Sequence, residues 1–244
     1  MNKILIASTG AGLAMAALLA THSASAAERG FYVGVYYGQG SKDSEEAPYE
    51  ALANRNYDSF GFNPQSAVTS FDTKSNSYGF LGGFRIFEHL AIEGGFMDLG
   101  EVTYRNESTG VDHSRDRVLD TGDVDHTNDA INTWNQQIAS KSRGLSVSAL
   151  GILPITYRSE VFVRGGILLS SSELDIHISN GVDSASNNPD QQTSTDFLVG
   201  VGASYTFAEI YAVRLEYQRI FDAGSEATGE QDLDLISLGV TVTF

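Results

Sequence analysis

A group of four aspartates in the middle of the chain could bind a metal ion. Asp120, Asp123 and Asp125 lie in one short segment with Thr and Gly, and Asp129 follows closely. Carboxylate oxygens are the ligands that Ca²⁺ prefers, so this segment is a candidate calcium site. Its order of ligands differs from that of an EF-hand loop, and a solvated acidic loop explains the same residues. We therefore predict no metal site and name these four aspartates as the candidates.

Charged residues also occur at intervals in stretches that are otherwise small or apolar. The five that concern the interior of the protein are Arg85, Glu93, Arg164, Arg214 and Glu216. Charges in a low-dielectric interior are costly unless opposite charges face them. If the fold turns these residues inward, we expect an ion-pair network in which Arg85 meets Glu93. The side chains of Tyr32, Tyr36 and Gln218 should complete its hydrogen bonds.

The segments that carry these residues alternate between apolar and polar or small side chains. In one of them, Leu145 and Val147 oppose Ser146 and Ser148. Period-two alternation is typical of β-strands whose two faces meet different surroundings. Eight segments show it, at residues 31–38, 77–87, 90–100, 144–153, 161–170, 197–207, 211–218 and 236–244. Each has roughly the ten residues with which a tilted strand crosses a bilayer.

Two features of these segments favour a transmembrane barrel over a soluble antiparallel sheet. Aromatic residues lie at both ends of the apolar face, as they do in the girdles of membrane barrels. The lower girdle would contain Phe31, Phe84, Tyr205, Phe207, Tyr211 and Phe244, and the upper one Tyr37, Tyr78, Phe96, Phe197 and Tyr217. The polar face carries mostly small side chains, which suits the narrow lumen of a small barrel.

The connections between the segments alternate in length, which is a third feature. Short turns are expected near residues 87–89, 154–159 and 207–209, and long loops at 40–75, 101–142, 173–195 and 222–231. We therefore predict an all-β fold, an eight-stranded antiparallel up-and-down transmembrane β-barrel with long extracellular loops and short periplasmic turns. Because lipid offers no hydrogen-bond partner to a free edge, the eighth strand must pair with the first.

The start of the chain has the features of a secretory signal peptide. A short basic region precedes an apolar stretch over residues 4–20, and Ala24 and Ala26 occupy the small positions before a cleavage site. A transmembrane helix is the alternative, but the stretch is short for a span and no basic cluster follows it. The sequence predicts residues 1–26 as a signal peptide and residues 27–244 as the barrel domain.

The composition excludes several classes of protein. The chain has 244 residues, of which 31 are acidic and 15 basic, and its net charge of −16 argues against a nucleic-acid binder. Cysteine is absent, which rules out disulfides and thiolate metal sites. No motif for ATP, flavin or nicotinamide is visible, so we expect no cofactor. Most of the excess negative charge falls in the long loops, as a solvated surface or as a partner for lipopolysaccharide through divalent cations.

Two stretches resemble the OmpA-like β-barrel family of outer-membrane proteins. Residues 82–100, GGFRIFEHLAIEGGFMDLG, are similar to the second hairpin of that family. Residues 237–244, SLGVTVTF, resemble its C-terminal assembly signal. The signal positions are Gly239, Val242 and Phe244, and Val242 stands where the family often has an aromatic residue.

This resemblance implies an integral protein of the bacterial outer membrane, in contact with lipid and lipopolysaccharide and assembled by the secretion and barrel-assembly machinery. We expect a monomer, and no periplasmic peptidoglycan-binding domain. The leading hypothesis is a non-enzymatic protein that stabilises the envelope and presents acidic loops for adhesion or resistance. The interior charges would then be a structural plug. The alternative is a narrow small-solute or ion channel, porin-like, in which they would form a gate.

A remote alternative is a lipid A-modifying hydrolase. The string His177-Ile178-Ser179-Asn180 resembles the His-x-Ser-Asn motif of the lipid A 3-O-deacylase family. In that family the histidine activates the serine and an acid orients the histidine. Here no Glu follows Ser179 closely, so Asp190 would have to replace it, and the motif lies before the sixth strand. We therefore predict that the protein is not an enzyme.

One helix is expected in the second long loop. Ile131, Trp134 and Ile138 have helical spacing and follow candidate capping residues at 127–129. We expect this helix to pack on aromatic residues of the first long loop, Tyr57, Phe60 and Phe62.

Overall fold

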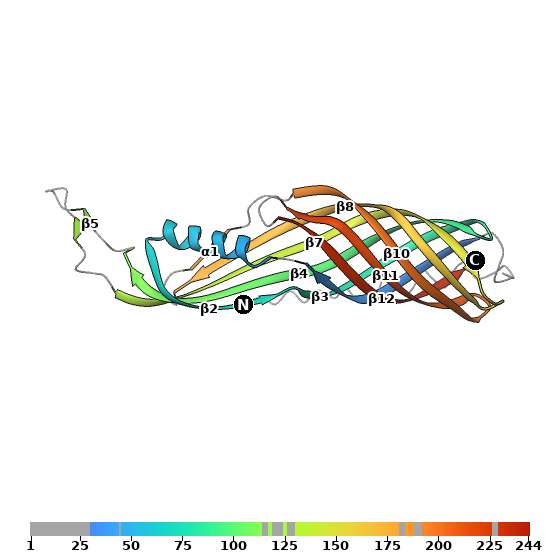
Figure 1. Ribbon diagram of the computed structural model, residues 1–244, viewed down its shortest axis with the longest axis horizontal. Coiled ribbons are helices and arrows are strands. Elements are labelled where there is room, and N and C mark those ends of the chain that lie inside the picture. Colours follow the sequence, from blue (N-terminus) through green and yellow to red (C-terminus); the bar gives the residue numbers. More distant parts are fainter. Residues whose placement is uncertain are drawn as a thin grey trace, which may run out of the picture.

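The strands form one closed wall in the computed structural model (Figure 1). The structure describes residues 30–43, 45–113, 117–118, 124–125, 130–180, 184–187, 192–225 and 229–244. The predicted signal peptide lies outside these residues and stays a prediction.

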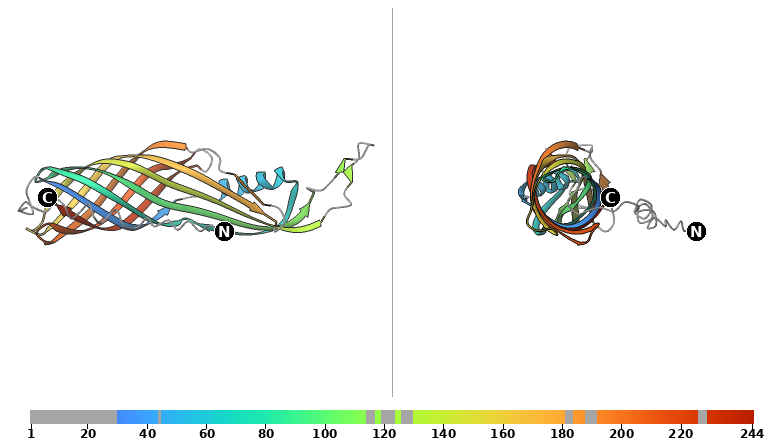
Figure 2. Two further views of the ribbon diagram at one scale, coloured as in Figure 1. Left: turned by 180° about the vertical axis from the view of Figure 1, so that it is seen from behind. Right: turned by 90° about the vertical axis from the view of Figure 1, so that its right-hand side faces the viewer.

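Eight strands make up the barrel, and each is antiparallel to its neighbours. They are β1 (Phe31–Lys42), β3 (Lys74–Phe87), β4 (Leu90–Asp112), β7 (Ala130–Pro154), β8 (Ser159–Ser179), β10 (Gln192–Ala208), β11 (Tyr211–Ser225) and β12 (Gly229–Thr243). Pairing of β8 with β10 continues the wall, and pairing of β12 with β1 closes it, with Val240 opposite Val35. The view along the long axis in Figure 2 shows the resulting ring. The predicted fold class is confirmed.

The apolar residues of the alternating segments face outward, as expected. Tyr37, Tyr78 and Phe197 are all more than half exposed at one level of the wall, and Phe31 and Tyr205 are exposed at the other. An exposed apolar band of this kind is stable in lipid and would be unfavourable in water.

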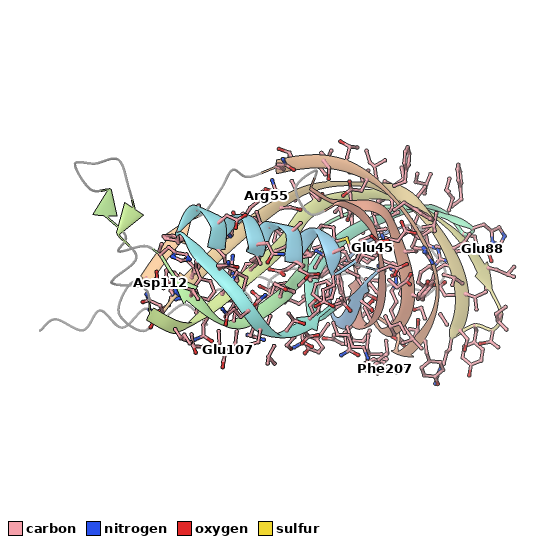
Figure 3. All side chains as sticks on the ribbon, turned by 60° about the vertical axis from the view of Figure 1, so that its left-hand side comes forward. Glu45, Arg55, Glu88, Glu107, Asp112 and Phe207 are labelled. Carbon is pink, nitrogen blue, oxygen red and sulfur yellow. The ribbon has the colours of Figure 1, made fainter. Side chains whose placement is uncertain are left out.

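Short turns join the strands at one end of the barrel, which we call the turn end. Glu88 and His89 link β3 to β4, a few residues after Pro154 link β7 to β8, and Glu209 and Ile210 link β10 to β11. Both ends of the described chain lie here as well, since the backbone N–H of Phe244 donates to the carbonyl of Phe31. Figure 3 places Glu88 and Phe207 at this end, opposite Asp112.

At the other end the wall continues beyond the exposed apolar band as a structure that we call the extension. The strands β4, β7 and β8 run on through it, and β2 (Phe62–Asp72) and β9 (Ser184–Asn187) pair with β4 and β8 there. Helix α1 (Ala47–Ser59) packs along this sheet (Figure 1). A separate two-stranded sheet joins β5 (Arg117–Val118) to β6 (Val124–Asp125).

The extension corrects the expectation of long irregular loops. Much of the predicted loops at 40–75 and 101–142 is regular structure, and residues 131–138 lie in β7 and not in a helix. The reason is tertiary, because β4 and β8 offer backbone hydrogen-bond partners on both sides of β7. Among the described helices, none is both long and apolar enough to span a membrane.

A bulge at Gly100 changes which face of β4 points inward. The pairing of β4 with β7 shifts between Asp98 and Glu101, and Gly100 has a φ of +73°. Before the bulge, the odd-numbered residues Glu93 and Met97 are buried; after it, the even-numbered Tyr104 is buried. A Cβ atom at Gly100 would lie 2.6 Å from the carbonyl oxygen of Asn76, so both the conformation and the space favour glycine.

Candidate functional site

Four of the predicted interior charges meet in the lumen. Glu93 on β4, Arg164 on β8, and Arg214 and Glu216 on β11 are all buried. Arg164 Nε lies 2.6 Å from Glu216 Oε1, and Arg214 Nη1 lies 2.6 Å from Glu93 Oε1. Arg164 also pairs with Glu93, and Arg214 Nη2 lies 3.0 Å from Glu216 Oε2. Each charge therefore has two opposite charges as neighbours, and the cluster is neutral overall.

Polar and aromatic neighbours hold this cluster in place. The hydroxyl of Tyr32 donates to Glu93 Oε1 at 2.6 Å, and Arg164 Nη1 donates to Ser148 Oγ at 2.6 Å. The guanidinium of Arg214 stacks over the ring of Phe162, with 4.0 Å between its central carbon and the ring centroid. Buried ion pairs persist when such contacts satisfy their remaining hydrogen bonds.

The structure departs from the expected network at three residues. Arg85 pairs with Glu160 at 2.9 Å, nearer the turn end, and not with Glu93. Glu160 was not among the expected residues. Among the described residues, neither Tyr36 Oη nor Gln218 Oε1 has a hydrogen-bond partner. Tyr36 instead packs against apolar side chains.

These apolar side chains form a layer that the alternation did not predict. The layer contains Met97, Leu99, Leu168, Leu198, Ile220, Leu233 and Leu235, all buried and in mutual contact. On β4, β8 and β11 it follows the charge cluster toward the extension, with Leu168 just beyond Arg164 and Ile220 just beyond Glu216. Its sequence signal is a run of consecutive apolar residues, such as Phe197-Leu198-Val199, where both faces of a strand are apolar.

Beyond the apolar layer lies a small polar one. Lys42 at the end of β1 is buried, and its Nζ donates to Ser142 Oγ at 2.9 Å. Ser142 Oγ in turn lies 3.2 Å from Ser172 Oγ, within hydrogen-bonding distance. Because burial disfavours the charged form, the pKa of the Lys42 ammonium falls to about 8.

An apolar core under α1 forms the top of this stack. Tyr49 and Ala53 of α1 pack on Tyr104 and Ile138, and Tyr57 packs nearby with Phe62 and Trp134. The ring centroid of Trp134 lies 5.5 Å from that of Phe60 and 5.6 Å from that of Phe62. The expected contact between these aromatic residues therefore exists, although Trp134 reaches it from a strand.

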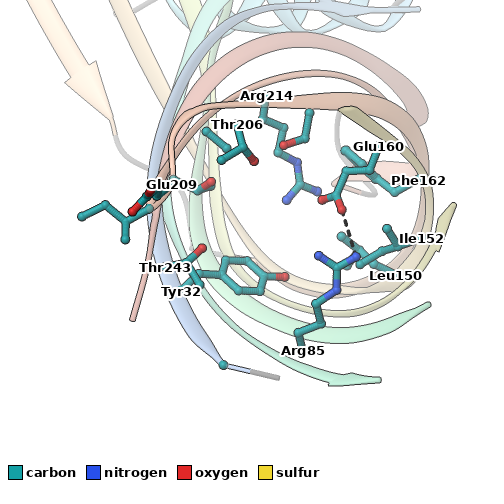
Figure 4. A pocket seen from close by; sticks show the side chains of 15 residues that line it. Tyr32, Arg85, Leu150, Ile152, Glu160, Phe162, Thr206, Glu209, Arg214 and Thr243 are labelled. Atoms are coloured by element: carbon teal, nitrogen blue, oxygen red, sulfur yellow. Dashed lines mark hydrogen bonds and ion pairs between the residues drawn. The ribbon is translucent and has the colours of Figure 1, made fainter. Parts of the chain in front are cut away.

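At the turn end a shallow pocket opens into the lumen. Tyr32, Arg85, Glu160 and Arg214 point into it, and its volume is about 70 Å³ (Figure 4). A polar space of this volume is large enough for ordered water molecules. The inner end of the pocket is formed by Arg214 of the charge cluster, so this cluster closes the lumen on the side of the turn end.

Comparison with known proteins places this architecture in a family. The model of the OmpA-like transmembrane domain matches residues 26–244. The chain belongs to this family.

Individual relatives of this OmpA-like barrel are distant. Outer membrane protein A of Yersinia pseudotuberculosis is 25% identical over 164 residues, which cover 66% of this chain and 38% of that protein. Outer membrane protein P5 of Haemophilus influenzae is 27% identical over 228 residues, which cover 92% of this chain and 52% of that protein. The chain thus spans about half the length of these relatives, or less.

A solved structure with a similar architecture is that of Ail, the attachment invasion locus protein of Yersinia pestis. It is 10% identical, and the match covers 89% of this chain and 100% of that one with a TM-score of 0.45.

The three residues of the predicted assembly signal lie on or directly after β12 of the OmpA-like barrel. Gly239 pairs with Tyr36 across the closing seam, and Val242 pairs with Val33. Phe244 follows the strand and is held by the hydrogen bond to Phe31. Their role as an assembly signal stays a prediction.

The His177-Ile178-Ser179 part of the hydrolase motif lies in the extension and not in the barrel. His177 is exposed on the outer side of β8 and pairs with Gln137 and Ser186 in neighbouring strands. It lies farther along β8 than lipid-facing Leu169, by about 20 Å at the rise of a tilted strand. Asp190 lies outside the described residues.

The candidate calcium ligands cannot be placed as a site in this OmpA-like barrel. Asp120, Asp123 and Asp129 lie outside the described residues, and of Asp125 only the backbone in β6 is described. Within the described part of the chain, no three acidic or histidine side chains are grouped as a metal site.

Proposed function

We propose that this protein is a non-enzymatic, non-conducting barrel of the outer membrane that holds a folded, acidic extension outside the cell. The observation that carries the proposal is the apolar layer of the lumen, formed by seven buried side chains directly beyond the charge cluster. An apolar constriction resists wetting, and ions do not cross it unless it opens.

The other layers support a closed lumen. The charge cluster fills the barrel on one side of the apolar layer, and the helix-covered core fills the space on the other. The pocket at the turn end ends at the same cluster. An eight-stranded barrel is narrow enough for side chains to fill its interior. A channel would require several packed layers to move together.

The extension supports a role in contact with the surroundings. The strands β4, β7 and β8 each have more than 20 residues and continue from the barrel into the extension. An aromatic core under α1 makes the extension a folded platform. Long connections of membrane barrels face the exterior, so we place the extension there. The chain has a net charge of −16, and we propose that this platform serves in adhesion or resistance.

Single-channel recording tests the closed lumen. The folded barrel is inserted into a planar bilayer, with folding checked by heat-dependent electrophoretic mobility, and Glu93→Ala is recorded beside the wild type. We expect no discrete openings from either protein, because the apolar layer stays in place when Glu93 is removed. Ion-selective openings of the wild type that grow in Glu93→Ala would overturn the proposal and favour a gated pore.

Surface labelling tests the orientation. The chain has no cysteine, so a single one can be introduced at exposed Val68 in the extension or at exposed Glu88 at the turn end. A maleimide that does not cross membranes should label Val68→Cys on intact cells and Glu88→Cys only after lysis. The reverse pattern would contradict the proposed orientation.

A further inference from the structure

The sheet of the extension has open edges, whereas the barrel is closed. Its strand order is β2-β4-β7-β8-β9, and among the described residues no strand pairs with the outer side of β2 or of β9. β9 has only 4 residues, and a strand this short offers little edge for pairing. β2 has 11 residues and follows the margin of the extension in Figure 1, so its edge is the longer one.

The edge of β2 is accessible over residues 66–71. Residues 66–70 are all exposed, and the exposed fraction of Val68 is 75%. In the described part of the chain, the backbone groups that this stretch turns away from β4 have no hydrogen-bond partner. A stretch of about six residues extends over about 20 Å, the usual length of a β-strand. The edge is therefore long enough for one further strand.

β2 lacks the features that normally protect such an edge. Edge strands of natural proteins carry charged residues, proline or a bulge that discourage pairing with another chain. Here Pro64 and the register shift between Pro64 and Ser66 affect only the beginning of the strand. Residues 66–71 include no charged residue, proline or glycine, and Val68 and Phe71 are of types that favour strands. This stretch is therefore suited to pairing.

The inner face of β2 is open as well. Asn106 on β4 is buried, whereas its partner Thr69 on β2 is exposed. The same holds for buried Ser108 and its exposed partner Ala67. The cover that buries β4 therefore ends before this part of β2. A strand added beside β2 would bury Val68 on the outer face and Ala67 and Thr69 on the inner one, with affinity supplied mainly by backbone hydrogen bonds.

Charge indicates which partner suits this edge. Residues 59–71 include no charged side chain, and on the adjacent β4 the charges of Arg105 and Glu107 cancel. Residues 45–58, in and just before α1, contain four acidic side chains and one basic one. The edge is thus neutral in acidic surroundings. A partner segment that is uncharged overall at its centre and basic at its ends matches this distribution.

A second copy of the chain matches the edge less well. Two copies in one membrane would point their extensions the same way, so their β2 strands, which run along the long axis, would meet in parallel (Figure 1). Parallel pairs are slightly less stable than antiparallel ones, and two acidic extensions would repel each other. A segment of another protein is free to pair in the antiparallel direction.

We propose that the free edge of β2 binds an extended segment of another protein by strand addition, antiparallel to residues 66–71, and that this segment is basic at its ends. The inference deepens the adhesion role proposed above and rests on the outward orientation of the extension. It does not depend on whether the lumen conducts.

Titration with a synthetic peptide tests this edge. Residues 66–72 already pair with residues 103–109 of β4, and the free edge of β2 presents the same side chains. A peptide with the sequence of residues 103–109 and uncharged ends is therefore the probe, and its binding to the folded protein in detergent micelles is measured by calorimetry. The same peptide with every backbone nitrogen methylated lacks hydrogen-bond donors and should bind at least tenfold more weakly. Equal binding of the two peptides would overturn strand addition.

A matched pair of variants locates the binding edge. Val68→Glu brings a like charge opposite the glutamate of the probe and should weaken binding about threefold. Ile131→Glu is the control, because Ile131 is also β-branched and exposed but lies on β7, which has β4 and β8 on its two sides. The fluorescence of Trp134, the single tryptophan, reports whether the extension stays folded in both variants. Unchanged binding in folded Val68→Glu, or equal loss in Ile131→Glu, would overturn the site.

Further arms define the partner. The probe with two lysines added at each end should bind about threefold more tightly than the probe with two glutamates, and salt should reduce the difference. Equal affinities would overturn the basic ends of the partner. Self-association of the protein without peptide that is lost in Val68→Glu would overturn the partner in favour of a second copy. Peptide binding in micelles is independent of orientation, which the cysteine labelling reports, so failure of the edge and failure of the orientation can be distinguished.

Discussion

The barrel and the extension share strands but place their apolar side chains on opposite faces. In the barrel, β7 turns Leu145 and Val147 toward lipid and Ser146 and Ser148 toward the lumen. In the extension, the same strand turns Trp134 inward. The difference shows that the medium outside the wall decides which face is apolar: lipid favours apolar side chains outside, and water favours them inside.

The strands achieve this reversal in two ways. In β7 and β8 the even-numbered residues face inward along the whole strand, and only their types change. On β8, for example, the inward residue is Arg164 in the barrel and Ile176 in the extension. In β4 the bulge at Gly100 shifts the inward positions by one residue. Neighbouring strands therefore use different devices, and the register between β4 and β7 shifts at this boundary, between Asp98 and Glu101.

Removing Glu93 should have the largest effect on the barrel side of this comparison. Glu93→Ala leaves Arg164 and Arg214 buried with one acidic partner each, and loss of a buried charge partner costs about 3–5 kcal/mol. We expect a fall of this size in the free energy of unfolding, measured by urea titration in lipid vesicles. Glu107→Ala, at an exposed position of the extension, is the control; equal effects would contradict a special role of the lumen cluster.

Removing Trp134 tests whether the extension is an independent part. Trp134→Ala opens a cavity beside Phe60 and Phe62, and such changes cost about 3–5 kcal/mol where the site cannot collapse. We expect faster proteolysis of the extension while the urea midpoint of the barrel changes little. If the barrel midpoint falls as far as in Glu93→Ala, the two regions unfold as one unit.

The smallest effect concerns Lys42, which lies between the two regions. Burial lowers the pKa of Lys42 to about 8, below its ordinary value near 10.5. Between these values the unfolded chain binds more protons than the folded one, so stability should rise with pH, by up to about 3 kcal/mol. Lys42→Met should lack this rise. The free energy of unfolding of both proteins is measured at about pH 7, 9 and 11, which span these two pKa values. The same dependence on pH in both proteins would contradict the assignment to Lys42.

The barrel could be predicted from sequence because its rules are local. Lipid imposes strict alternation, as in residues 144–153, and the aromatic residues mark where the bilayer ends. The three short turns were also predicted correctly. The meeting of Glu93 with Arg164 and Arg214 depends on strand stagger, which alternation does not reveal, and for the same reason Arg85 was assigned the wrong partner.

The extension was harder to predict because its structure depends on neighbours. Residues 131–138 have helical spacing, but β4 and β8 lie beside them and make a strand the better solution. The helix over Ala47–Ser59 was not expected, since its apolar residues are few and gain their stability from the sheet beneath. The apolar layer was not predicted because its residues stand in runs such as Phe197-Leu198-Val199, where both faces of the strand are apolar and alternation gives no signal.

The seam between β1 and β12 has a consequence for how the protein is made. It joins the first described strand to the last, and Phe244 hydrogen-bonds to Phe31 across nearly the whole sequence. Contacts of such long range form slowly, because the entropy of the intervening chain must be lost first. Until the final strand arrives, every intermediate exposes two unpaired edges to its surroundings. Aggregation through these edges is therefore a hazard at every step before β12 pairs with β1.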